Sequence, residues 1–124
     1  GQPTHAFDLG RLAGRTISVR AMRDGERLVT LDGIDRPAIV GEIAICDAER
    51  PVAFAGVMGG RDSEVTDATT DVLLEVAVFD PRVVRRVRRA VGLSTDASYR
   101  FERGVDAGFV AEAAARTAAL LTAV

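Results

Sequence analysis

The first half of the chain carries short apolar runs separated by polar and glycine-containing breaks, the pattern of a protein built from short strands. Residues 15–21 (RTISVRA) alternate, with Ile17 and Val19 on one face, which predicts a half-buried strand. Residues 27–37 hold two short runs around Asp32-Gly33. This dipeptide accepts the positive φ angles of a tight hairpin turn, so we expect a hairpin here.

Three further runs predict strands. Residues 42–47 (EIAICD) and 51–57 (PVAFAGV) are separated by a short polar connection. Residues 71–79 (DVLLEVAVF) are apolar on both faces, a pattern typical of a central strand.

After residue 79 the period of the pattern changes from two to that of a helix. Asp80 is a good N-cap, Pro81 suits the first helical position, and Gly92 suits the end. Between them four valines form one face, at positions 83, 84, 87 and 91. The alanine-rich residues 107–124 predict a second helix. The expected fold is therefore α+β, an antiparallel β-rich sheet or sandwich core followed by two C-terminal helices.

Composition narrows the class of protein. The 124 residues are 48% apolar and 27% charged, which predicts one globular domain over residues 1–124. No run is long enough to span a membrane. The one cysteine, Cys46, excludes an internal disulfide and fits a reducing, cytoplasmic setting. A net charge of −2 argues against a broad nucleic-acid footprint but not against a local one.

The stretch AFAGVMGGRDSEV, residues 53–65, raises the first question about function. Its glycines, Gly59 and Gly60, are followed by Arg61-Asp62-Ser63, whereas a P-loop needs a lysine and a hydroxyl residue there. This argues strongly against a phosphate cradle. A tight turn and a pocket floor, where absent side chains leave room for a ligand, both remain open.

Glu75 is the second candidate. Strand alternation places it on one face with Leu73, Ala77 and Phe79, all of them apolar. An unpaired polar group on such a face costs roughly 2–7 kcal/mol, and a charge costs more. Glu75 is therefore either paired with one of the 16 basic residues, all arginine, or is an acid awaiting a polar ligand in a pocket.

His5 is the only histidine, and alone it indicates either a packing residue or a site residue. No cluster of histidine and cysteine predicts a zinc site, and no serine lies in a GxSxG motif. One face of the first predicted helix carries a row of arginines, suited either to solvent or to phosphate contact: Arg82, Arg85, Arg86 and Arg89.

Five motifs in fixed order carry a resemblance: GQPTHAFD, TLDG, AGVMGG, VLLEVAVFDP and TDASYRFERGVD. Together they resemble the B3/B4 region of the bacterial phenylalanyl-tRNA synthetase β subunit. The match covers residues 1–106, and the remainder continues as the expected helix. The resemblance implies a B3/B4-type fold and an editing site that hydrolyses tyrosine wrongly esterified to tRNA(Phe).

The resemblance also assigns roles. Glu75 matches the glutamate that recognises the phenol, and Gly59, beside Gly60, matches the glycine that leaves space for the tyrosyl ring. Thr95 and Ala97 match wall positions, and His5 matches the histidine near the scissile ester, where it holds either the water or the terminal adenosine. The sequence departs from the family pattern at Thr4 and Phe54, which alters the expected pocket shape.

The resemblance further implies that the chain is an excised part of a larger β subunit, lacking the upstream half of B3. The implied partners are tRNA(Phe), the α subunit and the other β-subunit domains, with no membrane. ATP and Mg²⁺ would serve the parent enzyme, and no cofactor or metal is expected in this segment. The alternatives are a stand-alone deacylase or small-molecule binding protein of the same fold, and a structural module whose pocket has decayed.

Overall fold

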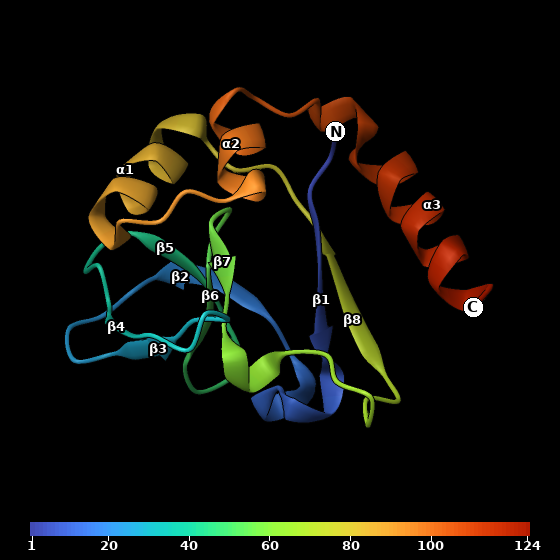
Figure 1. The fold of residues 1–124 in the computed structure, drawn as a ribbon, viewed down its shortest axis with the longest axis horizontal. Helices are drawn as coiled ribbons and strands as arrows, with labels where there is room; N and C mark the ends of the chain where they lie inside the picture. Colours follow the sequence, from blue (N-terminus) through green and yellow to red (C-terminus); the bar gives the residue numbers. More distant parts are fainter.

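The computed structural model describes residues 1–124 and consists of strands in its first two thirds and helices in its last third (Figure 1). The strands are β1 (Thr4–Asp8), β2 (Ser18–Ala21), β3 (Arg27–Val29), β4 (Asp35–Pro37), β5 (Ile43–Cys46), β6 (Pro51–Phe54), β7 (Met58–Gly59) and β8 (Val72–Val76). The helices are α1 (Pro81–Val91), α2 (Asp96–Glu102) and α3 (Val110–Thr122), with 3₁₀ turns η1 (Leu9–Arg11), η2 (Ala13–Arg15), η3 (Arg61–Ser63) and η4 (Ala107–Phe109). The expected α+β class is confirmed.

The strands form three antiparallel sheets. Four strands are ordered β2-β5-β6-β7, β3 pairs with β4, and β1 pairs with β8. Figure 1 shows α1 and α2 side by side across one end of the four-stranded sheet, while α3 runs beside β8. None of the helices combines the length and the apolarity that crossing a membrane requires.

The predicted hairpin is confirmed. The backbone N–H of Gly33 donates to the carbonyl of Thr30 at 2.8 Å, and Gly33 has φ +83°. Asp32 keeps a negative φ, and its carboxylate instead accepts hydrogen bonds from the Thr30 hydroxyl and the Ile34 N–H. The turn therefore depends on Gly33 for the positive φ angle and on Asp32 for the hydrogen bonds that its carboxylate accepts.

Helix α1 begins and ends as predicted. The Asp80 carboxylate accepts from the Arg82 N–H at 2.8 Å, Pro81 is the first helical residue, and Gly92 ends the helix at φ +69°. Val84 and Val87 are fully buried, so the valine face packs on the core.

Three helices follow the strands, one more than expected. The missed helix is α2, which has only seven residues and begins at a capping box. The Thr95 hydroxyl accepts from the Ser98 N–H, and the Ser98 hydroxyl accepts from the Thr95 N–H. Phe101 of α2 is buried edge-on against Phe79, with ring centroids 5.0 Å apart.

The strands predicted over residues 15–21 and 71–79 are present as β2 and β8, but two details of these predictions are wrong. β8 is not central, because its one strand partner is β1, which the pattern did not predict. Val19 is 58% exposed, because β2 is the edge of the four-stranded sheet and Ile17, just before β2, makes the contact with the core.

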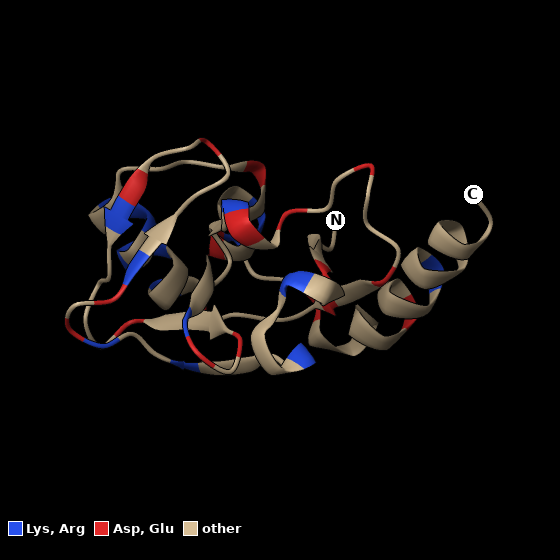
Figure 2. Ribbon diagram, turned by 90° about the horizontal axis from the view of Figure 1, so that it is seen from below, with Lys and Arg blue, Asp and Glu red and all other residues tan.

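Charged residues are distributed unevenly over the fold. Figure 2 shows them on the loops, the strands and the helices; α1 carries five arginines, whereas the longer α3 carries only Glu112 and Arg116. Of the residues of α3, Ala113 alone is buried. The core of 16 buried residues lies instead between the sheets, α1 and α2.

Candidate functional site

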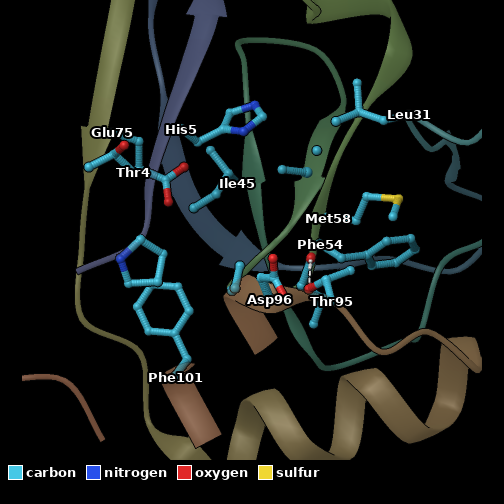
Figure 3. Close-up of a pocket in the computed structure, with 16 residues that line it drawn as sticks. Thr4, His5, Leu31, Ile45, Phe54, Met58, Glu75, Thr95, Asp96 and Phe101 are labelled. Atoms are coloured by element: carbon cyan, nitrogen blue, oxygen red, sulfur yellow. Dashed lines mark hydrogen bonds between the residues drawn. The ribbon is translucent and has the colours of Figure 1, made fainter. Parts of the chain in front are cut away.

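A pocket of about 290 Å³ lies between the β1–β8 pair, strands β5 to β7 and the start of α2 (Figure 3). Eight of its 16 lining residues are hydrophobic. Its size is at the lower end of the ~300–1,000 Å³ typical of small-molecule sites. Five predicted site residues line it: His5, Gly59, Glu75, Thr95 and Ala97.

Glu75 projects from β8 into this pocket, as Figure 3 shows. It is half-buried, and it takes part in none of the ion pairs or side-chain hydrogen bonds of the chain. Pairing with an arginine, one of the two interpretations of the sequence, is therefore wrong. Burial raises the pKa of Glu75 to about 7, because an apolar surrounding disfavours the charged form.

His5 stands directly opposite Glu75 in the β1–β8 ladder. Its ring packs edge-on against Phe7, with centroids 4.4 Å apart, and its Nε2 is buried without a hydrogen-bond partner. Burial lowers the pKa of His5, so the neutral imidazole is favoured. The site thus contains an imidazole that favours its neutral form and makes no hydrogen bond to the protein.

Gly59 makes room for this ring. A Cβ built on Gly59 would lie 2.8 Å from the His5 Nε2 and closer still to Cε1, which no side chain tolerates without displacing the imidazole. The space beside Gly59 is therefore taken by His5 rather than left empty.

Gly60 does not belong to the pocket. It lies next to a separate polar hollow, and a Cβ there would come within 2.6 Å of the Val52 carbonyl oxygen and 2.7 Å of Leu28 Cδ1. Gly60 is needed because its own backbone packs closely against the backbone of β6 and the Leu28 side chain of β3.

The two adjacent glycines are not a turn either. Gly59 pairs with Ala53 in β7, and Gly60 is extended, with φ −88° and ψ 149°. The turn of this stretch lies earlier, where the Val57 N–H donates to the Phe54 carbonyl and Gly56 has φ +73°. Interpreting the glycine pair as a tight turn is therefore wrong.

Thr95 and Ala97 form the wall at the start of α2. Besides capping α2, the Thr95 hydroxyl donates to the Val57 carbonyl at 2.7 Å. This bond joins the helix start to the turn after β6, so it holds two walls of the pocket at a fixed separation.

The pocket also includes residues that the sequence did not single out. Ile45 and Met58 contribute apolar surface, and Asp96 contributes a carboxylate at the first position of α2. The missed signal was the Thr95-x-x-Ser98 pattern, which marks a helix start and would have placed Asp96 beside Thr95 and Ala97. Thr4 and Phe54, the two departures from the family pattern, both line the pocket.

The arginines of α1 lie outside the pocket. All four predicted contacts, Arg82, Arg85, Arg86 and Arg89, are exposed. Arg82 pairs with Asp80, and Arg86 pairs with Glu42 at 2.7 Å. Arg85 and Arg89 form no ion pair.

No three His, Cys, Asp or Glu side chains lie close enough together to hold a metal ion. The polar side chains that line the pocket are a carboxyl group on β8, an imidazole on β1, a carboxylate on α2 and the hydroxyls of Thr4 and Thr95.

These features define the class as an α+β domain with an apolar pocket that holds a half-buried acid without a protein partner. The chain belongs to the B3/4 domain family, whose model matches residues 1–124. The resemblance inferred from the five motifs is confirmed.

The relatives of the chain are β subunits of phenylalanine–tRNA ligases. It is 55% identical to the one from Salinibacter ruber over 121 residues and 50% identical to that of Halalkalibacterium halodurans over 124 residues. It is 55% identical to the subunit of Nitratidesulfovibrio vulgaris over 106 residues. These matches cover 98%, 100% and 86% of this chain but 15%, 15% and 13% of the relatives. The chain therefore spans about a seventh of the length of these proteins.

Proposed function

We propose that the chain is the editing module of a phenylalanyl-tRNA synthetase β subunit. Its pocket binds the tyrosyl group of Tyr-tRNA(Phe), and the ester is hydrolysed there. The observation that carries this proposal is Glu75, a half-buried acid without a protein partner that points into an apolar pocket.

The need for such a site is physical. An apolar pocket rejects an isostere with one added hydroxyl only about 10²-fold, whereas a site built to hydrogen-bond that hydroxyl discriminates by roughly 10⁴–10⁵. In this pocket the phenol of tyrosine pairs with Glu75. Phenylalanine leaves the buried acid without a partner, and that loss disfavours its binding.

Either protonation state of Glu75 serves this recognition. With a pKa of about 7, the acid is present in both forms near neutral pH. The carboxylate accepts a hydrogen bond from the phenol O–H. The protonated acid either accepts that hydrogen bond through its carbonyl oxygen or donates its own O–H to the phenol oxygen. The aromatic ring then lies against the apolar walls formed by Ile45, Phe54 and Met58.

Hydrolysis in this proposal needs no nucleophile from the protein. Water adds to the ester carbonyl, the ribose hydroxyl leaves with a proton, and free tyrosine and tRNA are the products. Positioning supplies much of the rate, because an aminoacyl ester is already activated. His5 is the residue proposed to position water or the terminal adenosine, because it lines the pocket and the protein does not hydrogen-bond its ring. Gly59 contributes by giving His5 its place in the pocket wall.

The proposal places the wider activity in the parent enzyme. Aminoacylation of tRNA(Phe), with its use of ATP and Mg²⁺, belongs to the α subunit and the remaining β-subunit domains. The arginines of α1 that form no ion pair, Arg85 and Arg89, are the proposed contacts for the tRNA backbone.

The test is made in the full-length synthetase that contains this chain. Glu75→Ala removes the phenol acceptor, so deacylation of Tyr-tRNA(Phe) is lost while aminoacylation with phenylalanine persists. Glu49→Ala is the matched control, because Glu49 is an exposed loop residue outside the pocket. Clearance of the tyrosyl ester by Glu75→Ala at the wild-type rate would contradict the proposed role and favour a structural module.

A further inference from the structure

The pocket is acidic as well as apolar. Among its 16 lining residues the ionisable ones are His5, Glu75 and Asp96, and none is an arginine. The absence of arginine from the pocket contrasts with the rest of the chain, which contains 16 basic residues, all of them arginines. A ligand with a positive charge and no negative charge suits such a pocket.

Asp96 is the acid whose role is open. It is exposed at the pocket rim, and its carboxylate takes part in none of the ion pairs of the chain and is not the cap of α2, which is Thr95. Figure 3 shows Asp96 and Glu75 on different walls of the pocket, Asp96 on α2 and Glu75 on β8. A ligand between these walls meets one carboxyl group at each end.

We propose that Asp96 binds the α-ammonium group of the aminoacyl ester. This inference rests on the proposed editing function and adds a second recognition point to it. An aminoacyl ester carries an ammonium group, and its carboxyl group is neutral because it is esterified to the ribose. Glu75 then receives the side-chain hydroxyl and Asp96 receives the ammonium group, so the two acids orient the ester between them.

The same arrangement favours release of the product. Hydrolysis converts the neutral ester into a carboxylate, and the pocket offers no arginine or lysine to pair with it. The new negative charge lies between two acids, which weakens the binding of free tyrosine relative to its ester.

Asp96 also has an ordinary structural role, since an acidic residue in the first turn stabilises a helix. That role does not depend on the ligand, whereas the proposed role requires a free α-amino group. The experiment therefore compares two substrates that differ only in that group.

Deacylation of Tyr-tRNA(Phe) and of N-acetyl-Tyr-tRNA(Phe) is measured in the full-length synthetase containing this chain, with wild type and Asp96→Asn. We expect Asp96→Asn to slow the free-amine substrate about three- to tenfold and to leave the N-acetyl substrate unchanged, as for a partly exposed charge pair. Tyrosinamide should inhibit the wild type better than N-acetyltyrosinamide, and this preference should disappear in Asp96→Asn. Asp24→Asn, an exposed carboxylate in the turn between β2 and β3, should change neither comparison.

Equal slowing of both substrates by Asp96→Asn overturns the inference and assigns Asp96 a structural role. If Asp96→Asn hydrolyses the free-amine substrate at the wild-type rate, the inference is overturned as well. In both cases the wild-type enzyme still edits Tyr-tRNA(Phe), so the proposed function is not affected. A wild-type enzyme that hydrolyses neither ester is a different result, because it overturns the proposed function and the inference with it.

Discussion

His5 and Glu75 face each other across the β1–β8 ladder, and no hydrogen bond or ion pair joins them. Burial lowers the pKa of His5 and raises that of Glu75 to about 7. Both shifts favour the uncharged form, so near neutral pH the neutral imidazole is favoured and a substantial share of Glu75 is protonated. The two side chains are thus not paired with each other, and Glu75 has no protein partner where it lines the pocket.

The shift at Glu75 predicts a pH-dependent stability. Between its ordinary value of 4.5 and about 7, the folded state keeps a proton that the unfolded state has lost, so stability falls as the pH rises through this window. The full cost above this window is up to about 3 kcal/mol.

Glu75→Gln removes that cost, so the variant should be more stable than the wild type at about pH 8 and should lose this advantage at about pH 4. Denaturant unfolding of the chain at the two pH values checks it. Glu49→Gln is the control, because its side chain lies in an exposed loop. A gain of the same size at both pH values would contradict burial of the charge as the cause.

Gly59 and His5 predict a coupled pair of mutations. Gly59→Ala should destabilise the chain by about 1–3 kcal/mol, because the new Cβ overlaps the imidazole. In a His5→Ala background the same change should cost little, since the overlapping ring is gone.

Gly60→Ala is the matched control for this cycle. Its Cβ meets the backbone carbonyl of Val52, which His5→Ala does not move. Its cost should therefore be the same in both backgrounds. Unfolding measurements on the six proteins give the coupling energy, and equal costs of Gly59→Ala with and without His5 would show that the two residues do not share the space.

The hydroxyl of Thr95 predicts a further stability effect. Thr95→Val removes both the cap of α2 and the hydrogen bond to the Val57 carbonyl, so we expect a loss of about 1–3 kcal/mol. Thr117→Val on α3 is the control, because its hydroxyl bonds back to the Ala113 carbonyl of its own helix. Equal effects of the two changes in unfolding experiments would rule out a special role for the Thr95 hydroxyl.

The arginine face of α1 predicts a change in salt dependence. If Arg85 and Arg89 bind tRNA phosphates, replacing both by glutamine in the full-length synthetase should weaken binding alike for correct and incorrect aminoacyl groups. It should also flatten the log–log salt slope by about 0.7–0.9 for each phosphate that is no longer neutralised. Binding at two or more salt concentrations measures this, with exposed Arg116→Gln on α3 as control. An unchanged slope would leave both residues as solvent-facing surface.

Local signals in the sequence were sufficient where structure depends on neighbouring residues. The hairpin around Gly33 and the limits of α1 follow from turn and capping chemistry, which acts within a few residues. Hydrophobic periodicity missed α2, because seven residues carry too little of it, and the Thr95-x-x-Ser98 cap was the one local signal of that helix. The pattern also misplaced Val19, because it does not tell which strand lies at the edge of a sheet.

The residues of the site also separate into those whose place follows from local sequence and those whose place depends on tertiary contacts. The sequence by itself determined that Glu75 stands on an apolar strand face, because side-chain alternation along a strand is a local property. Tertiary structure decided that no arginine reaches Glu75, that His5 takes the space beside Gly59, and that Gly60 faces a different hollow. It also brought Asp96 to the rim of the pocket. These relations join β1, β7, β8 and α2, which lie far apart in the chain, and contacts of that kind arise only when the separate elements pack against one another.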